Sequence, residues 1–437
     1  TKREGEKMNL DMLHPADQLV MFMERIYGHG MTTTSGGNLS ILDDNGDIWI
    51  TPGSIDKGSL RREDMVCIKP DGTIIGTHKP SSEYPFHQHI YKTRPDLKAV
   101  LHAHPPALVA FSIVRRLPDT SLIPNVKFSC GEIGMAKYGL PGSQDLGDKI
   151  SEEFEKGFNT VILENHGVVI GAKSMFEAFK SFETLDFSAR LEIDANNIGT
   201  PNPLTPEQID WYKSRNYVSM DEFVSNRISS EEKAARREMC KLIKRAYNQQ
   251  LFNSTQGTFS QRLDDDTFII TPSGCDRNYL EPEDIVKIKG GYKELGKVPS
   301  RSVELHREIY AQQPHVNSII IAHPPCLMSF AVTNEPLDSR TIPESYILMR
   351  TIPKLEFGAN YLKPKETASV FKANTPIAII KNDCVIVTGD SLLNAFDRLE
   401  VAEYSARAII AAKDLGEVVA INDQEIEEIE DAFHLAK

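Results

Sequence analysis

The chain has 437 residues, a formal net charge of −13 and an ordinary apolar share of 40%. This length predicts more than one domain, and the apolar share is enough for large cores. The acidic balance, without a dense Lys/Arg cluster, argues against nucleic acid as a partner. No run of about 18 apolar residues exists, and the polar start TKREGEKMNL (1–10) is unlike a secretion signal, so we expect no membrane partner.

The six cysteines are scattered along the chain and form no CxxC pair. Such spacing fits reduced thiols better than a disulfide framework. We therefore expect a cytoplasmic protein.

The chain contains one long internal repeat. Six stretches of the first half recur in the same order, each 217 to 220 residues downstream. They are GGNLS and QGTFS (36–40, 256–260), WITPGSIDKGSL and IITPSGCDRNYL (49–60, 269–280), PSSEYPFHQHIY and PSRSVELHREIY (80–91, 299–310), LHAHPPALVAF and IIAHPPCLMSF (101–111, 320–330), ILENHGVVI and IIKNDCVIV (162–170, 379–387), and DFSAR and EYSAR (186–190, 403–407). So long a period indicates two whole domains, not a solenoid.

The domains are expected at 8–198 and 232–437, joined by a linker at 199–231. The stretch NNIGTPNPLTPEQ (196–208), at the start of this join, is rich in Pro, Asn and Thr, as linkers often are.

Each repeat predicts a mixed α/β domain. In the first, PSSEYPFHQHIY predicts a helix that begins just after the two serines, which would cap it. AVLHAHPPALVAF (99–111) begins as a buried strand and breaks at its two prolines. TVILENHGVVIGA (160–172) predicts two strands joined by a tight turn at 165–167. The apolar spacing of 174–195 predicts a long closing helix.

Three histidines form a candidate metal site. His102 and His104 are two apart on a predicted strand, where side chains at i and i+2 point to the same face. His166 lies in the turn between two later strands. Three His ligands with one open position are typical of catalytic zinc. The alternative for the HxH pair alone is two unrelated histidines, one of them buried and hydrogen-bonded.

Glu83 and several small polar residues complete the candidate site. Glu83 follows two serines at a predicted helix start, where it could act as a proton-transfer base beside a metal, rather than as a solvated surface carboxylate. The stretches GGN (36–38) and TPGS (51–54), with Ser81 and Ser82, offer donors to an anion such as phosphate. Each of these stretches alone could also be an ordinary turn.

The set GGNLS, ITPGS, KPSSE, HAHPP and ENHG, in this order, resembles the class II aldolase/adducin family, which includes fuculose-phosphate aldolase. The resemblance covers 8–195 and, more weakly, 232–415. It implies an α/β fold, a three-layer αβα sandwich around a mostly antiparallel sheet, present twice. It further implies zinc ligands at His102, His104 and His166.

The resemblance also implies roles for the surrounding residues. Glu83 matches the catalytic acid/base, and Tyr138 matches a proton-donating tyrosine that acts at the aldehyde oxygen. The implied phosphate-binding positions are Asn38, Gly53, Ser54, Ser81 and Ser82. The order Pro-Gly-Ser at 52–54 departs from the commoner Pro-Ser/Thr-Gly, which the second repeat keeps as TPSG, so the donors of this loop stay open.

The activity implied is that of a zinc-dependent aldolase with one zinc per chain. It would cleave a ketose 1-phosphate to dihydroxyacetone phosphate and an aldehyde through a zinc-stabilised enediolate. Histidine ligands also accept other divalent metals. The alternatives are a sugar-phosphate 4-epimerase or a dehydratase on the same site, or an adducin-like non-catalytic interaction protein. Glu83 in PSSE favours the aldolase over the epimerase, and the retained histidines disfavour the non-catalytic alternative.

The second repeat has lost most of these residues. The alignment places Ile321 at His102, His323 at His104, Asp383 at His166, Ser302 at Glu83, Thr258 at Asn38 and Phe357 opposite Tyr138. An aliphatic side chain cannot bind zinc, and one His with one Asp makes a weak site. We therefore expect the second domain to be non-catalytic.

The resemblance implies a homo-oligomer, because family enzymes form fourfold tetramers with sites between subunits. Two tandem chains could build a pseudo-tetrameric ring, or four chains a tetramer. The family's tyrosine comes from the neighbouring subunit, and in an alternating ring the live site would face Phe357. Three possibilities follow. The first domains of two chains contact each other, or Tyr346 or Tyr361 acts as the proton donor, or the reaction needs no such donor.

Overall fold

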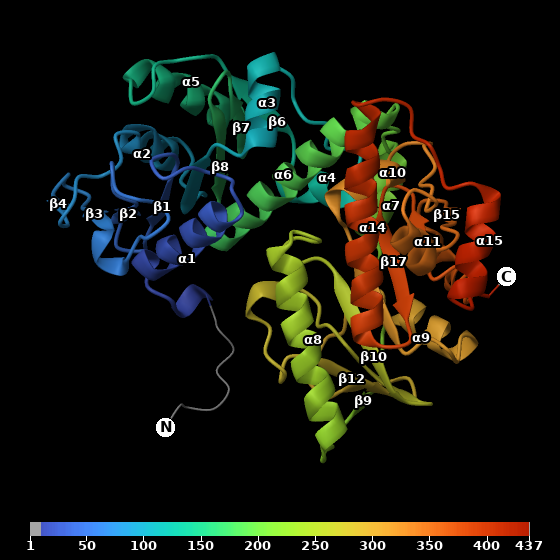
Figure 1. Ribbon diagram of the computed structural model, residues 1–437. Coiled ribbons are helices and arrows are strands. Elements are labelled where there is room, and N and C mark those ends of the chain that lie inside the picture. The colour runs from blue at the N-terminus through green and yellow to red at the C-terminus, as the bar shows by residue number, and fades with distance from the viewer. Residues whose placement is uncertain (1–9, 437) are drawn as a thin grey trace. The chain divides into compact units, whose positions relative to one another are not determined.

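The computed structural model describes residues 10–436 and divides into two units (Figure 1). The first comprises residues up to 121 together with 125–189, and the second comprises 122–124 and 190 onward. Of the polar start at 1–10, all but residue 10 lies outside the described part. Between residues 10 and 436, no helix is both long and apolar enough to cross a membrane.

The first unit is built on an eight-stranded sheet in the order β4-β3-β2-β1-β5-β8-β7-β6. Its strands are β1 (Asn38–Leu42), β2 (Ile48–Ile50), β3 (Val66–Ile68), β4 (Ile74–Ile75), β5 (Ala99–Ala103), β6 (Ile133–Ala136), β7 (Thr160–Leu163) and β8 (Gly167–Ala172). All neighbours are antiparallel except β6 and β7.

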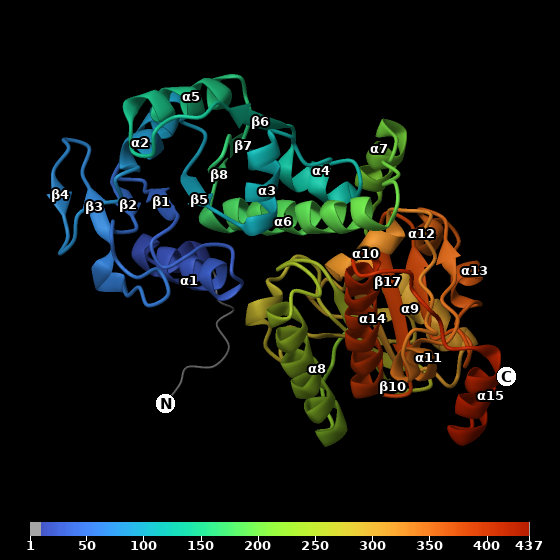
Figure 2. The ribbon, with the colours of Figure 1, turned by 45° about the horizontal axis from the view of Figure 1, so that its top comes forward.

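Helices cover both faces of this sheet, which gives three layers (Figure 2). They are α1 (Pro15–Gly28), α2 (Tyr84–Thr93), α3 (Pro106–Val114), α4 (Pro124–Cys130), α5 (Gln144–Glu155) and α6 (Met175–Ile198). One face packs on α2 and α5, whose Phe86 and Phe154 join the buried strand residues. On the other side, Phe22 of α1 and Phe179 of α6 lie 5.1 Å apart between ring centroids. Burial of these apolar side chains is the main favourable term for such a layered fold.

The second unit repeats this order and adds one strand: β15-β16-β17-β14-β10-β11-β12-β13-β9. Its strands are β9 (Glu222–Phe223), β10 (Thr258–Asp264), β11 (Thr267–Ile270), β12 (Val286–Lys289), β13 (Tyr292–Glu294), β14 (Ser318–Ala322), β15 (Lys354–Leu355), β16 (Ile377–Ile380) and β17 (Cys384–Gly389). Only the pairs β15–β16 and β13–β9 are parallel.

Helices again lie on both faces of the second sheet. They are α7 (Pro206–Ser214), α8 (Ser230–Asn248), α9 (Val303–Gln312), α10 (Pro325–Ala331), α11 (Pro343–Met349), α12 (Ala359–Leu362), α13 (Pro364–Ala368), α14 (Leu392–Lys413) and α15 (Asp423–Ala432). Ile309 of α9 and Phe371, just after α13, pack on one face. Phe396 of α14 packs on Phe259 of β10. The predicted mixed α/β fold with a mostly antiparallel sheet, present twice, is confirmed.

Local predictions around the site mostly hold. The strand–turn–strand at 160–172 and the helix over 174–195 are both present as β7, β8 and α6. The predicted serine cap is wrong: α2 begins at Tyr84 with Glu83 at the N-cap, and no side chain caps it. The reason is that the Ser81 hydroxyl accepts from the Glu83 N–H at 3.3 Å, one residue ahead of the helix.

Candidate active site of the first domain

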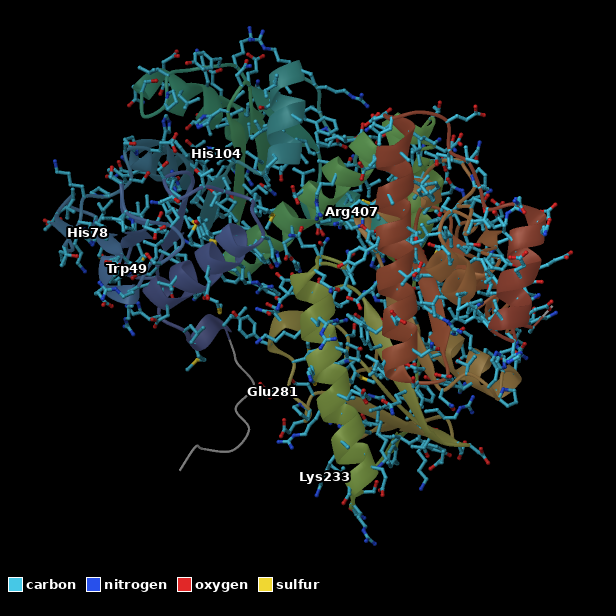
Figure 3. The ribbon with its side chains drawn as sticks, in the orientation of Figure 1. Trp49, His78, His104, Lys233, Glu281 and Arg407 are labelled. Atoms are coloured by element: carbon cyan, nitrogen blue, oxygen red, sulfur yellow. The ribbon has the colours of Figure 1, made fainter. Side chains whose placement is uncertain are left out.

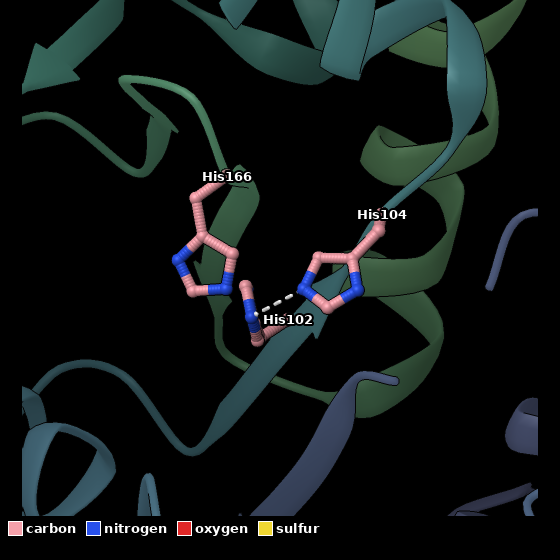
Figure 4. A group of neighbouring side chains, drawn as sticks. All are labelled: His102, His104 and His166. Atoms are coloured by element: carbon pink, nitrogen blue, oxygen red, sulfur yellow. Dashed lines mark hydrogen bonds between the residues drawn. The ribbon is translucent and has the colours of Figure 1, made fainter. Parts of the chain in front are cut away.

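Three histidines converge at one end of the central strands of the first sheet (Figure 4). His102 is on β5, His104 follows that strand, and His166 sits in the turn before β8. Their ligand nitrogens all lie within 4.8 Å of one another. β5 and β8 are antiparallel neighbours and His166 directly precedes β8, so the fold itself brings the side chains of His102 and His166 together.

Each imidazole is set up as a neutral ligand. The Nδ1 of His102 lies 2.9 Å from the Val168 carbonyl, which leaves its Nε2 toward the other rings, 3.0 Å from the Nε2 of His104. Burial lowers the pKa of His102 and that of His104 to about 3, and lowers the pKa of His166. The neutral form is the one that binds a metal.

The Nδ1 of His166 is buried and has no hydrogen-bond partner among the described residues. The His166 Nε2 is the nitrogen that faces Glu83 and His102, and the three neutral, convergent rings fit a divalent metal held by three nitrogens. His102 also has an outer partner in the Val168 carbonyl, as metal-bound histidines usually do.

Two glycines make room for this cluster. A Cβ on Gly36 would lie 2.8 Å from the Nδ1 of His104, and one on Gly167 would lie 2.5 Å from the Ala103 carbonyl oxygen. Any side chain at either position would displace the strand or the ring. The glycines of the GGN and ENHG motifs are therefore explained by close approach.

Glu83 faces the histidines, and its two carboxylate oxygens differ in their hydrogen bonding. Its Oε2 accepts a hydrogen bond from the Asn38 amide at 2.8 Å and lies 3.3 Å from the His102 Nε2. Its Oε1 lies 3.8 Å from the His166 Nε2 and has no hydrogen-bond partner among the described residues. One oxygen is therefore held by the Asn38 amide, and the other faces the histidines without a hydrogen bond.

A buried relay fixes the amide that holds Glu83. The His87 Nε2 bonds to the Oδ1 of Asn38, which turns the amide nitrogen toward Glu83. The His87 Nδ1 bonds to the Ser40 hydroxyl at 2.7 Å, and the Tyr91 hydroxyl donates to the Ser40 carbonyl at 3.0 Å. Since each member has a partner, the relay is rigid.

The two loops expected to bind phosphate lie side by side. Pro52 and Pro80 form an isolated bridge, and the Gly53 N–H donates to the Lys79 carbonyl at 3.0 Å. Ser54 has the positive φ of 58° and is exposed, as is Ser82, while Ser81 is buried. The donors therefore come from a paired set of turns. Their binding of phosphate stays a prediction.

Lys57 is a residue that the sequence analysis missed. It is 2% exposed, and its ammonium donates to the carbonyls of Pro52 at 2.8 Å and Ile55 at 3.2 Å. It thus places a positive charge under the TPGS loop, and its burial lowers its pKa. The repeat could have pointed to Lys57, because the aligned position in the second repeat is also basic, Arg277. In the structure Arg277 is likewise buried and donates to loop carbonyls.

Tyr138 lies apart from this cluster. Its side chain is 51% exposed, and its backbone N–H donates to the Glu164 Oε2 at 3.1 Å. Within the described part of the chain, no contact joins Tyr138 to the three histidines. Its role as a proton donor stays a prediction.

The second domain has no equivalent cluster. Across residues 10–436, the triad of the first domain is the one group of three or more His, Cys, Asp or Glu placed to hold a metal. The Nδ1 of His323 is buried without a hydrogen-bond partner, and burial lowers the pKa of His323 to about 4.

The fold and the triad together define the class of protein. The chain matches the family described as "Class II Aldolase and Adducin N-terminal domain" twice, over residues 17–193 and 237–410. It therefore belongs to this family, with two copies of the domain in one chain.

Known relatives of single-domain length act on sugar phosphates. The chain is 30% identical to the 5-deoxy-D-ribulose 1-phosphate aldolase of Bacillus thuringiensis serovar kurstaki over 44% of this chain and 91% of that protein. It is 30% identical to the 3-oxo-tetronate 4-phosphate decarboxylase of Haemophilus influenzae over 40% and 84%. A solved L-fuculose 1-phosphate aldolase is 28% identical over 45% and 93%, with a TM-score of 0.41.

Proposed function

We propose that the first domain is a metal-dependent aldolase that cleaves a ketose 1-phosphate to dihydroxyacetone phosphate and an aldehyde. The observation that carries this proposal is the placement of Glu83. Its unpaired Oε1 faces three convergent, neutral histidines, beside a pair of donor-rich loops. The relatives of the chain include an aldolase named for a ketose 1-phosphate.

The histidines His102, His104 and His166 would hold a divalent metal, and zinc is the metal that three nitrogen ligands favour. When bound there, the metal supplies Lewis acidity that stabilises negative charge on the substrate oxygens. The TPGS loop, with Lys57 beneath it, and the PSSE loop would hold the phosphate.

The cleavage needs two proton movements. The C3–C4 bond breaks, the C4 hydroxyl loses its proton as it becomes the aldehyde, and C3 gains a proton. Glu83 would carry the proton at C3, and this role is supported by an Oε1 without a hydrogen-bond partner while Asn38 holds the other oxygen. Tyr138, exposed on its loop, is proposed to act at the aldehyde oxygen of a substrate or across an oligomer contact.

A second candidate is decarboxylation of a 3-oxo-acid phosphate, which the Haemophilus influenzae relative favours. There the bond to the carboxylate breaks, carbon dioxide leaves, and the same carbon gains a proton. Both reactions would use the same phosphate loops and the same Glu83. They differ in the group that leaves, which is an aldehyde in one reaction and carbon dioxide in the other.

The test is a substrate panel on protein purified without chelator. L-Fuculose 1-phosphate and 5-deoxy-D-ribulose 1-phosphate are assayed for dihydroxyacetone phosphate, and 3-oxo-tetronate 4-phosphate for carbon dioxide. His102→Ala is the control, and bound metal is measured by elemental analysis. Release of dihydroxyacetone phosphate from either ketose 1-phosphate, abolished in His102→Ala, supports the aldolase. Release of carbon dioxide from 3-oxo-tetronate 4-phosphate, with both ketose 1-phosphates left uncleaved, supports the decarboxylase. A wild-type protein that binds no added zinc contradicts both.

We also propose a homo-oligomer, either two chains in a pseudo-tetrameric ring or a tetramer. Tyr346 and Tyr361, the two candidates of the second domain to replace Tyr138, are engaged within that domain. The Tyr346 hydroxyl donates to Glu430 at 2.7 Å, and Tyr361 packs against the Arg215 guanidinium at 3.7 Å. Direct contact between first domains, or chemistry without this donor, is therefore favoured. A solution mass equal to one chain contradicts the oligomer.

A further inference from the structure

The segment expected to be a linker runs along the second domain's counterpart of the active site. The Tyr212 hydroxyl, on α7, donates to the Oδ1 of Asp383 at 3.1 Å. Five residues later, the Tyr217 hydroxyl bonds to the Ser273 hydroxyl at 3.0 Å. Asp383 stands at the place of His166, and Ser273 stands in the loop that matches TPGS.

Aromatic packing covers a third matching position. Phe357 follows β15 as Tyr138 follows β6. The ring of Phe357 is stacked on Tyr212 at 5.9 Å and meets the edge of Trp211 at 5.7 Å. A Cβ on Gly358 would lie 2.8 Å from the Trp211 ring, so the indole rests directly on the backbone. Aromatic pairs of this kind add to the stability that burial already supplies.

The same segment satisfies a carboxylate that burial would otherwise penalise. Asp383 is 3% exposed, and its second oxygen accepts from the Asn360 amide at 3.0 Å. The Arg215 guanidinium lies between the rings of Tyr212 and Tyr361, at 3.4 and 3.7 Å from their centroids. A buried carboxylate is unfavourable unless hydrogen bonds and an opposite charge compensate it. Here the Tyr212 hydroxyl and the Arg215 charge come from the segment.

Both ends of the segment are also anchored to the second domain. The Asn202 N–H donates to the Val332 carbonyl at 2.7 Å, and the Asn202 carbonyl accepts from the Asn382 amide at 2.8 Å. At the other end, β9 pairs with β13 as the ninth strand of the sheet. In the described part of the chain, the sheet of the first domain has no ninth strand.

We propose that residues 202–223 are a built-in occupant of the second domain's former substrate site. The segment covers the positions that match a metal ligand, the phosphate loop and the tyrosine of the first domain. The second copy lacks the residues that match Glu83, His102 and His166. In their absence, its site binds a segment of its own chain. This inference does not depend on which reaction the first domain carries out.

Trypsin tests the docking in the full chain. The segment contains the exposed Lys213, on the helical backbone of α7, and the half-buried Arg215, and it is followed by the exposed Arg227, which lies outside any helix or strand. Cleavage after Arg227 is expected to be about tenfold or more faster than after Lys213 or Arg215, since proteolysis follows the open population. Tyr212→Ala and Asp383→Ala should each speed cleavage after Arg215 about tenfold or more, because each removes a hydrogen bond to a charged group. Tyr404→Ala, at an exposed tyrosine of α14, should leave it unchanged.

Tryptophan quenching gives an independent reading. The chain has two tryptophans, so Trp49→Phe leaves Trp211 as the reporter. Docking predicts that acrylamide quenches Trp211 weakly and that Tyr212→Ala raises the quenching. If Tyr212→Ala changes the far-ultraviolet circular dichroism of the whole chain, Tyr212→Phe decides, because it keeps the ring and removes only the hydroxyl. The proposal is overturned if Arg215 is cut as fast as Arg227 in the wild type, or if Tyr212→Phe speeds no cleavage.

Discussion

The two domains share the first half of one buried relay and differ in the second half. In the first domain, Ser40 and Tyr91 support His87, which orients Asn38 toward Glu83. In the second domain, Ser260 and Tyr310 support His306 in the same way, at 2.6 Å and 2.7 Å from the serine hydroxyl.

There the second relay stops. The His306 Nε2 is buried without a hydrogen-bond partner among the described residues. Thr258, at the place of Asn38, bonds instead to Ser300 at 2.8 Å, and Ser300 bonds to Ser302 at 3.0 Å. The Ser/His/Tyr part is thus present in both domains, whereas the Asn and Glu are present only in the domain that has the three histidines, as expected if they serve the proposed chemistry.

The largest expected effect comes from the metal ligands. His102→Ala should abolish metal binding and lower activity about 10³-fold or more, because several kcal/mol of Lewis-acid stabilisation are lost. His323 is the one histidine of the triad that the second domain keeps, at the place of His104. His323→Ala should leave metal content and activity unchanged. Elemental analysis and the substrate assay check both. Equal metal loss in the two variants would break the comparison.

Glu83→Gln is expected to come next. Removal of a positioned general base costs about 10²-fold or more in rate. The bound metal should stay, because Glu83 is not one of the three convergent ligands. Ser302→Ala, at the matching position of the second domain, should change nothing in the assay. A Glu83→Gln enzyme with unchanged kcat would remove Glu83 from the proposed mechanism.

Exchange of the residues at the end of the relay sharpens the comparison further. Asn38→Thr should lower activity about 10-fold to 100-fold, the usual cost of losing an outer partner of a site. Thr258→Asn should give the His306 Nε2 an acceptor and raise the free energy of unfolding by about 1 kcal/mol. Kinetics and urea unfolding measure the two effects. A destabilised Thr258→Asn protein would show that the second site no longer has room for the amide.

The pH dependence of stability, measured on chelator-treated protein, extends the comparison from single residues to the two domains. Burial lowers the folded-state pKa of His102 and of His104 to about 3, and also lowers those of His87 and His166. Below the unfolded pKa of about 6.5, the unfolded chain takes up protons that the folded chain refuses. Stability of the first domain is therefore full above that pH and falls as the pH drops toward 3, by up to about 1.4 kcal/mol per pH unit for each histidine.

The second domain should respond less steeply to acid. It has His306 and His323, with pKa values of about 3 and 4, and burial raises the pKa of its Glu403 to about 7. A raised carboxyl pKa acts in the opposite direction, because the folded state then binds the extra proton between the unfolded carboxyl pKa and 7. Trp49 and Trp211 report the two domains separately in single-tryptophan variants (Figure 3 labels Trp49). Equal acid sensitivity of the two signals would contradict this prediction.

The sequence by itself determined the repeat, the α/β class and the three histidines. These rest on local patterns, since alternation, turn residues and HxH spacing fix which side chains share a face of a strand. Gly36 and Gly167 could also be picked out, although the reason for them, contact with His104 and with the Ala103 carbonyl, required coordinates.

Only the tertiary structure decided the contacts between distant segments. His87 reads as one more residue of a helix until it is seen to bond to Asn38, 49 residues away. Lys57 reads as a solvated charge until its burial under the TPGS loop is seen. Tyr212 reads as part of a linker, yet it bonds to Asp383, 171 residues away. Periodicity records which face of an element is buried, but the partner on that face depends on how the whole chain packs.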